Sequence, residues 1–150
     1  MARVVKGHQA EANAFVPLPL RDGVAPSYLW LTETRAGGML RFLCERFPDV
    51  SAVAWAARLG RGEIVDAKGV ALNADSHVRQ GMRIWYYREL EHDETPIPFQ
   101  ERVLFQDQHL LVADKPHFLP TIPTGRFLKE TLLVRLKRQY DLPHLVPIHR

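Results

Sequence analysis

The spacing of hydrophobic residues predicts two consecutive helices in the first half of the chain. Apolar residues recur at helical intervals over 39–47, so we predict a helix there. Leu40 and Cys44 stand one turn apart in it, and we therefore expect the Cys44 thiol to be buried and unreactive. Ser51 precedes the alanine-rich run 52–59, which favours a second helix with Ser51 as its N-cap.

Short strands are predicted to follow these helices. Residues 63–66 and 70–72 flank a turn that contains glycine, which is typical of a hairpin. The aromatic and β-branched run 82–87 favours a further strand. Because side chains alternate between the two faces of a strand, Tyr86 or Tyr87 is expected to face outward, where it could stack on a nucleic-acid base.

The second half of the chain shows strand patterns and then a helical pattern. The apolar runs 103–105 and 109–114 are separated by a tight polar turn at Asp107, and they predict an antiparallel strand pair. Apolar residues then recur at about one helical turn between Leu128 and Tyr140, which predicts a helix.

These elements predict an α+β protein with more than one domain. Residues 1–38 are rich in proline and glycine and are expected to be an irregular extension, in which only 28–31 resembles a short strand or an apolar packing segment. Residues 39–90 form one small module, and 91–100 is an acidic, proline-containing linker. Residues 101–150 then begin a second domain of mixed α/β character.

The distribution of charge along the chain suggests polyanions as one class of partner. The formal net charge of the chain is only +3, but residues 91–114 carry −5 and residues 115–150 carry +5. A basic segment beside an acidic one can attract polyanions, although a solvated basic helix face would show the same pattern.

Other features exclude several classes of protein. Hydrophobic residues make up 46% and charged residues 25% of the chain, which is typical of a globular protein. No run of apolar residues is long enough to cross a bilayer, and polar residues interrupt any apolar signal near the N-terminus, so we expect a cytoplasmic protein. The single cysteine excludes an internal disulfide, and the histidine spacing does not predict a metal site.

The order of elements over 39–90 resembles the S-four-like RNA-binding module, which is named for a protein of the small ribosomal subunit. In such modules two helices and a strand-turn edge form a basic surface for structured RNA. The residues that carry the resemblance are Phe42-Leu43, Asp49-Val50-Ser51, Gly62, Gly69, Val78-Arg79, Gly81 and Ile84.

Basic side chains of this module are the candidates for contacts with RNA phosphates, because arginine and lysine supply positive charge and hydrogen-bond donors. The alternative is that they are ordinary surface charges. The four candidates are Arg58, Arg61, Lys68 and Arg79.

A more specific resemblance lies in the second half. The run 103–116, VLFQDQHLLVADKP, resembles the opening of the catalytic domain of the RluA-type RNA pseudouridine synthases. In that family a strand pair ends in Asp-Lys-Pro and leads into a proline-containing loop, a helix and a segment that begins His-Arg. Pro120 and Pro123 keep their places in the loop, and His149 and Arg150 match the start of that segment.

The loop also departs from the family pattern at two positions. Phe118 stands where family members commonly have glycine, and Ile122 stands where they often have histidine. These differences suggest a subfamily with its own loop shape.

The resemblance implies an enzyme that breaks the bond between uracil and ribose, rotates the base and rejoins it through carbon. The target uridine must leave its stack, one aspartate acts as the nucleophile, and no metal or organic cofactor is needed. In the family this aspartate lies two positions after the matching arginine, so it is expected just beyond Arg150, and the 150 residues alone are expected to be inactive. The residues expected near the active site are Lys115, Pro116, His149 and Arg150.

The resemblance also implies the partners. We expect structured RNA, either ribosomal or transfer RNA, as the substrate of a monomeric protein, and neither DNA nor a membrane. The alternative hypothesis is a non-catalytic S-four-like RNA-binding protein that associates with ribosomal RNA.

Overall fold

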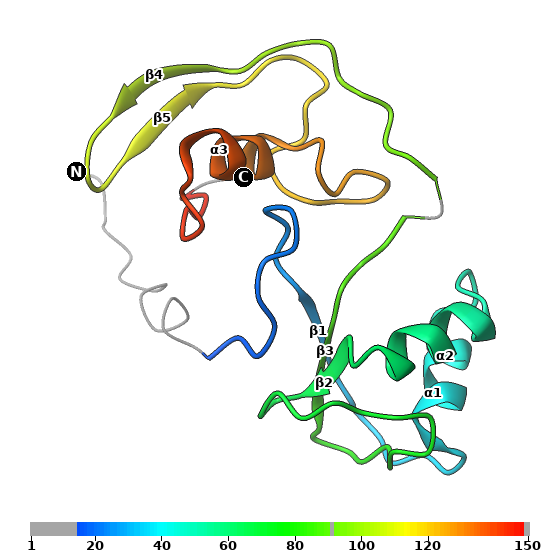
Figure 1. Cartoon of the computed structure of the whole chain (residues 1–150). Helices are drawn as coiled ribbons and strands as arrows, with labels where there is room; N and C mark the ends of the chain where they lie inside the picture. The colour runs from blue at the N-terminus through cyan, green and yellow to red at the C-terminus, as the bar shows by residue number, and fades with distance from the viewer. Residues whose placement is uncertain (1–14, 91, 149–150) are drawn as a thin grey trace. The chain divides into compact units, whose positions relative to one another are not determined.

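The structure is a computed structural model that describes residues 15–90 and 92–148. The described residues form two compact units (Figure 1). The first unit comprises the chain up to Pro19 and then Tyr28–Tyr86, and the second unit comprises Leu20–Ser27 and the chain from Tyr87 onward. The division after Tyr86 comes before the acidic segment 91–100, which belongs to the second unit and is anchored to it as described below.

The first unit contains two helices and a three-stranded sheet. Helix α1 spans Gly38–Arg46 and α2 spans Ala52–Gly60, in agreement with the two predicted helices. The strands are β1 (Ser27–Trp30), β2 (Ile64–Asp66) and β3 (Arg83–Tyr86). Their order in the sheet is β1-β3-β2, with β3 in the centre and antiparallel to β2. The predicted α+β class is therefore confirmed.

A serine cap defines the start of α2. Ser51 has an extended backbone, and its side-chain oxygen accepts a hydrogen bond from the Ala54 N–H at 3.2 Å. This bond satisfies one of the amides that the first turn of a helix leaves without an intrahelical acceptor. The predicted N-cap is confirmed.

The predicted hairpin after α2 is shorter than expected. Residues 70–72 do not form a strand, and Ala71 makes only an isolated bridge with Val65. The reason lies in Asp66, because its carboxylate accepts hydrogen bonds from the Lys68 and Val70 N–H groups and so closes a tight turn. The ladder partner of β2 is β3, which pairs Val65 with Trp85.

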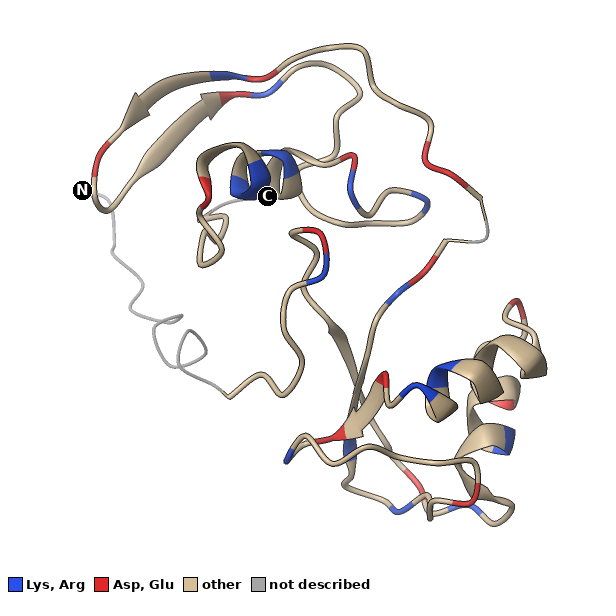
Figure 2. Cartoon of the chain, viewed as in Figure 1, with Lys and Arg blue, Asp and Glu red and all other residues tan. Residues whose placement is uncertain are grey.

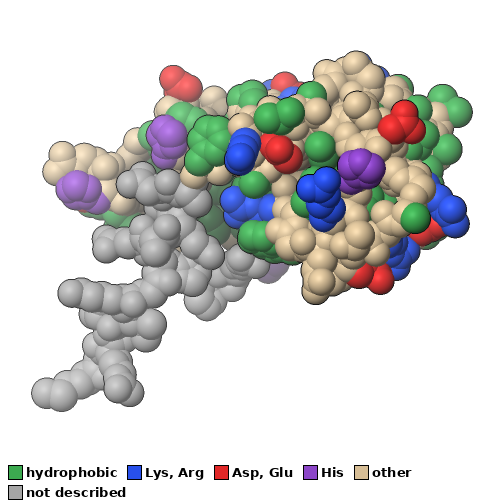
Figure 3. All heavy atoms as spheres, turned by 90° about the horizontal axis from the view of Figure 1, so that it is seen from below, with side chains coloured by type: hydrophobic (Ala, Val, Ile, Leu, Met, Phe, Trp, Pro, Cys, Tyr) green, Lys and Arg blue, Asp and Glu red, His purple; other side chains and the backbone are tan. Residues whose placement is uncertain are grey.

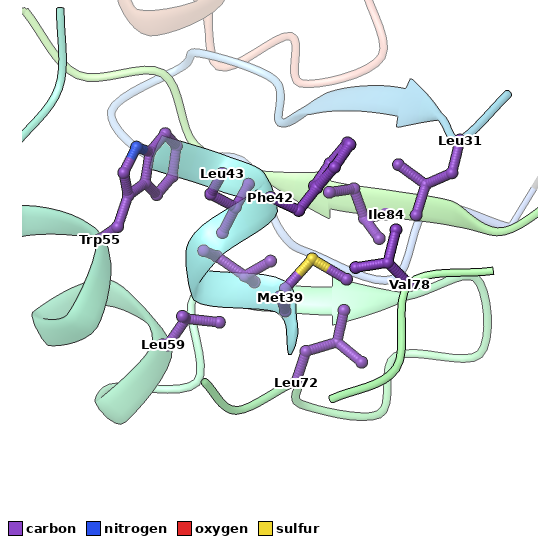
Figure 4. Packing of buried hydrophobic residues seen from close by; sticks show 10 residues of the cluster. Leu31, Met39, Phe42, Leu43, Trp55, Leu59, Leu72, Val78 and Ile84 are labelled. Carbon is purple, nitrogen blue, oxygen red and sulfur yellow. The ribbon is translucent and has the colours of Figure 1, made fainter. Parts of the chain in front are cut away.

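The core of the first unit lies between the helices and one face of the sheet (Figure 4). Cys44 packs against this core but is only half-buried, so the predicted burial of its thiol is confirmed only in part and its low reactivity stays a prediction. The buried residues are Leu31, Met39, Phe42, Leu43, Trp55, Leu59, Ile64, Leu72, Val78 and Ile84.

The two tyrosines at the end of β3 do not provide the outward-facing ring that strand alternation predicts. Tyr86 packs against the core, with its ring centroid 5.6 Å from that of Phe47 and 6.2 Å from that of Trp55. Tyr87 lies just after the strand, so the alternation no longer applies to it, and it is buried. The guanidinium of Arg21 stacks on the Tyr87 ring at 3.8 Å.

The second unit contains a strand pair and one helix. Strand β4 (Arg102–Gln106) is antiparallel to β5 (Leu111–Asp114). Asp107 forms the turn between them, because its carboxylate accepts hydrogen bonds from the N–H groups of His109 and Leu110, both at 2.7 Å. The predicted antiparallel pair is therefore confirmed.

Helix α3 spans Leu132–Tyr140 and begins later than the apolar pattern predicts. Thr131 caps it, with its side-chain oxygen accepting from the Val134 N–H at 3.4 Å. The amides just before Thr131 are bonded to the Glu94 carboxylate, so the residues that carry them do not join the helix. At the other end, Asp141 adopts a left-handed conformation with φ of 52° and ends the helix before Pro143.

Candidate functional site

The four basic residues predicted to contact RNA occupy different environments in the first unit. Lys68 and Arg79 are exposed. Arg61 is also exposed, but its guanidinium pairs with the Glu63 carboxylate at 2.8 Å. Figure 2 shows the Lys and Arg positions of this unit on several separate elements. On the face of the molecule shown in Figure 3, Lys and Arg side chains are interspersed with hydrophobic and acidic ones. Arg58 and Arg61 lie at the end of α2, Lys68 follows β2 and Arg79 precedes β3, so the four residues belong to separate parts of the unit.

Arg58 differs from the other three because it is only 9% exposed. Its guanidinium lies over the Trp55 ring, 4.8 Å from the centroid. Arg58 is three positions after Trp55 on α2 and next to Leu59, so all three residues share the buried side of the helix. This placement leaves little of the Arg58 side chain for a phosphate, and it contributes a cation–π contact to the core.

The segment that follows β5 is held in shape by Lys115. Its ammonium group donates hydrogen bonds to the carbonyl oxygens of Pro116, at 3.2 Å, and of Leu119, at 2.9 Å. Leu119 is buried, so the loop 116–119 is fixed at both ends. Lys115 thus organises the loop that was predicted to lie near the active site. His149 and Arg150, the other two residues predicted there, lie outside the described residues.

A pocket of the second unit lies next to the residues that the family resemblance implies for the active site. Lys115 and Pro116 are not among the residues that line it, and His149 and Arg150 lie outside the described residues. This pocket has a volume of about 490 Å³ and is lined mainly by apolar side chains of β5, of α3 and of residues 144–148. The segment that leads to His149 therefore lies beside the strand that leads to Lys115.

Phe118 is an unusual residue in the loop 116–119. Its φ is 65°, in the left-handed region that favours glycine, and its side chain is 81% exposed. Its ring centroid is 6.2 Å from that of Phe99. A non-glycine residue in this conformation costs about 1 kcal/mol. The backbone at Phe118 therefore has a conformation that glycine adopts without this cost.

We expect substitutions of Phe118 to follow this backbone conformation. Phe118→Gly removes the strain but adds freedom to the unfolded chain, so the stability of the second unit should change by no more than about 1 kcal/mol. Phe118→Val places a β-branched residue at positive φ and should cost about 1 kcal/mol or more. Denaturant unfolding of both variants checks this order, and a valine variant as stable as the glycine variant would contradict it.

The acidic segment 91–100 acts as an anchor. The Glu94 carboxylate accepts hydrogen bonds from three consecutive backbone N–H groups, at 2.9 Å from Leu128 and 2.8 Å from Lys129 and Glu130. Sequence reasoning treated this segment only as a spacer. The signal that was present is its strong negative charge next to a basic segment, but the pattern does not identify Glu94 as the residue that binds.

A second set of contacts holds the same segment around Arg135 of α3. The Arg135 guanidinium donates to the carbonyl oxygens of Ile97, at 2.7 Å, and Phe99, at 2.8 Å, and it pairs with Glu130 at 2.6 Å and with Glu101 at 3.1 Å. The Ile97 N–H in turn donates to Glu130 at 2.9 Å. These bonds fix the path by which the chain enters β4.

The pKa of Glu130 reflects these contacts. Burial raises this pKa, but the hydrogen bond from the Ile97 N–H and the Arg135 guanidinium outweigh burial and hold the pKa below the usual 4.5. Burial likewise lowers the pKa of Arg135, and its bonds to Glu130 and Glu101 more than compensate and raise it. Both groups are therefore charged at neutral pH.

The lowered pKa of Glu130 predicts a dependence of stability on pH. The ionised carboxylate is favoured in the folded state, so its contribution is complete above pH 4.5 and is lost as the pH falls through the lower folded pKa. Glu130→Gln removes this titration, and the melting temperature of the variant should fall less steeply than that of the parent between pH 5 and pH 2. Equal slopes for the two proteins would contradict the prediction.

No three His, Cys, Asp or Glu side chains within residues 15–90 and 92–148 come together in an arrangement that could hold a metal ion. Within the same described residues, no helix is both long and apolar enough to cross a membrane. 

Comparison with known proteins identifies relatives of this chain. No family model matches it. An uncharacterized RNA pseudouridine synthase of Synechocystis is 34% identical over 112 residues, which are 75% of this chain and 38% of that protein. The RNA pseudouridine synthase 5 of Arabidopsis thaliana is 29% identical over 106 residues, and that of rice is 30% identical over 109 residues. The chain spans 28% and 27% of these two proteins, so it corresponds to only part of each relative.

Proposed function

We propose that the protein to which this chain belongs converts uridine to pseudouridine in structured RNA, because the chain is similar to several proteins named RNA pseudouridine synthase. The single observation that carries this proposal is the 34% identity with a pseudouridine synthase over three quarters of the chain. The chain spans only 38%, 28% and 27% of these three relatives, so the activity belongs to the proposal and not to the 150 residues alone.

The geometry of the second unit supports this reaction. A uridine that leaves its stack needs a site for its planar base, and the open pocket beside β5 offers mainly apolar side chains against which a base could lie. The loop 116–119 is held by Lys115, so a group placed against it would meet a fixed surface. Fixed surfaces keep the reacting atoms aligned without further loss of entropy during the reaction.

We propose that the nucleophile is an aspartate at the second position after Arg150 in the reading frame, as in the family pattern. Its carboxylate attacks C1′ of the ribose as the bond between C1′ and N1 of the uracil breaks. The released uracil anion rotates, and its C5 carbon then displaces the carboxylate from C1′, which regenerates the aspartate. The proton on C5 is lost and N1 takes up a proton, so the product is an isomer of the substrate. Arg150 and His149 would orient the RNA and the adjacent backbone. Lys115 acts as a positioning residue, because its ammonium group bonds to loop carbonyls.

The substrate class we propose is ribosomal or transfer RNA. The first unit has the element order and the serine cap of the S-four-like resemblance, and Lys68 and Arg79 are its exposed candidates for phosphate contacts. Phosphate contacts supply affinity without sequence specificity, so they would hold the RNA while the second unit selects the uridine.

The proposal is tested with the full-length protein and unmodified transcripts of ribosomal and transfer RNA. Pseudouridine is mapped by a base-specific chemical adduct that stops reverse transcription. A new stop at a defined uridine in one of these RNAs is the expected result. If no transcript gains pseudouridine while the protein still binds ribosomal RNA, the non-catalytic RNA-binding alternative is correct and the enzyme proposal fails.

A further inference from the structure

The sheet of the first unit has a second face that the core does not use. Leu29, Ile84 and Tyr86 pack against the core formed with α1 and α2. Because neighbouring side chains in a strand point to opposite faces, the residues between them point away from the helices. These residues are Tyr28 and Trp30 on β1 and Arg83 and Trp85 on β3, and we call them the aromatic face.

Two rings of the aromatic face are open to solvent. Tyr28 is 53% exposed and Trp30 is 54% exposed, although both are large and aromatic. Trp85 is buried beneath them, with its ring centroid 5.0 Å from that of Tyr28. Strand β1 is at the edge of the sheet, with β3 as its one strand neighbour in that sheet.

Arg83 places a positive charge among these rings. Its guanidinium carbon is 5.1 Å from the ring centroids of Trp30 and of Trp85, and 5.7 Å from that of Tyr28. Among the described residues, no carboxylate pairs with Arg83, and its buried Nε–H has no hydrogen-bond acceptor. The aromatic rings therefore hold the guanidinium in place while its charge stays uncompensated by an acid from this part of the chain.

We propose that the aromatic face binds a single-stranded segment of RNA, with bases stacked on Trp30 and Tyr28 and a phosphate held by Arg83. This inference rests on the proposed function, which makes RNA the polymer that the protein meets. Exposed aromatic rings on a sheet beside an arginine are the groups that stack unpaired bases, and stacking tolerates any base because every base has a π face. A positive centre also matches a polyanion better than it matches an apolar protein surface.

This site would be separate from the residues predicted to contact RNA. Lys68 lies in the turn after β2 and Arg79 lies before β3, and neither is an aromatic residue or a member of the aromatic face. The two sets make different contributions, because Lys68 and Arg79 supply charge alone, whereas Trp30 and Tyr28 supply stacking. A substrate with an unpaired strand beside its helical part would engage both.

The test measures how the full-length protein binds a fluorescently labelled 12-nucleotide oligouridylate, using anisotropy. Trp30→Ala and Tyr28→Ala should each weaken binding by about 5- to 160-fold, which corresponds to the loss of one stacked base. Trp30→Phe keeps a ring and should recover most of the affinity. Val53→Ala is the matched control, because Val53 is an exposed apolar residue of α2 and does not belong to the aromatic face. The Val53→Ala variant should bind the oligouridylate with the affinity of the parent.

The dependence of affinity on salt separates stacking from charge. Each phosphate contact contributes a slope of about 0.7 in the plot of log affinity against log salt concentration for single strands. Arg83→Gln should lower the slope by about that amount, whereas Trp30→Ala should leave the slope unchanged while it lowers affinity at every salt concentration. Melting temperatures are measured for each variant, and affinities are compared only for variants that melt as the parent does.

Two results would overturn the inference. One is equal affinity of the parent, Trp30→Ala and Tyr28→Ala for the oligouridylate. The other is a change in sedimentation with no change in affinity, which would make the aromatic face a contact between protein molecules. The proposed function fails in a different assay. If the parent protein forms no pseudouridine but its binding of the oligouridylate still depends on Trp30 and Tyr28, the enzyme proposal is wrong and this inference stands.

Discussion

Leu43→Ala should unfold the first unit under conditions in which the parent protein remains folded. Leu43 is fully buried between α1, α2 and the sheet, and removal of such a side chain leaves a cavity that costs about 2–5 kcal/mol. The unit is small, so a loss of this size is a large fraction of its stability. Denaturant unfolding followed by the fluorescence of its tryptophans, with Trp55 in the core, measures the loss.

Val53→Ala is the control for this prediction. Val53 is on α2 but is 80% exposed, and alanine is a better helix former than valine. The stability of this variant should therefore differ from that of the parent by less than about 0.5 kcal/mol. If Leu43→Ala and Val53→Ala unfold at the same denaturant concentration, the description of the core is wrong.

Glu94→Ala should release the acidic segment 91–100 from the second unit. Its carboxylate is the acceptor for the N–H groups of Leu128, Lys129 and Glu130. Hydrogen bonds to a charged group are worth about 1.5–3 kcal/mol each when buried, and because Glu94 is half-buried we expect a total loss of about 2–3 kcal/mol. Hydrogen exchange of the three amides should speed up together with the fall in stability.

Glu89→Ala is the matched control for Glu94→Ala. The Glu89 carboxylate pairs with Arg21 at 3.5 Å, and both side chains are exposed. Exposed ion pairs contribute at most about 1 kcal/mol, so this variant should be only slightly less stable than the parent. Equal losses for the two variants, or unchanged exchange of the Leu128 to Glu130 amides in Glu94→Ala, would show that Glu94 is not an anchor.

Local features of the fold could be predicted from the sequence because they depend on neighbouring residues. Helical spacing and the Ser51 cap located α1 and α2, and the polar turn at Asp107 located the β4–β5 pair. In each case the interactions that form the element join residues only a few positions apart. A pattern within one segment is then sufficient.

Features that depend on distant partners could not be predicted in this way. The partner of β2 is β3, about 20 residues later, and no property of 63–66 distinguishes that pairing from the expected hairpin. The start of α3 depends on Glu94, which is 34 residues before Leu128. Such contacts are chosen by the packing of the whole unit.

The candidate site shows the same contrast between features set by neighbouring residues and features set by distant partners. The sequence motif makes Lys115 a candidate site residue, which stays a prediction, but it gives no sign of the bonds from its ammonium group to the loop carbonyls. The burial of Arg58 had a signal, because Arg58 is one helical turn after Trp55 and next to Leu59. The alternation of Tyr28 and Trp30 with leucines also placed both rings on one face, but which face would be open depends on where α1 and α2 pack.

The proposed pseudouridine synthase mechanism is tested most directly at the second position after Arg150 in the full-length protein. We expect an aspartate there, and its replacement by asparagine should abolish pseudouridine formation in the RNA that the parent modifies, while the affinity for that RNA is retained. A different residue at this position, or an asparagine variant that still forms pseudouridine at the rate of the parent, would contradict the proposed mechanism.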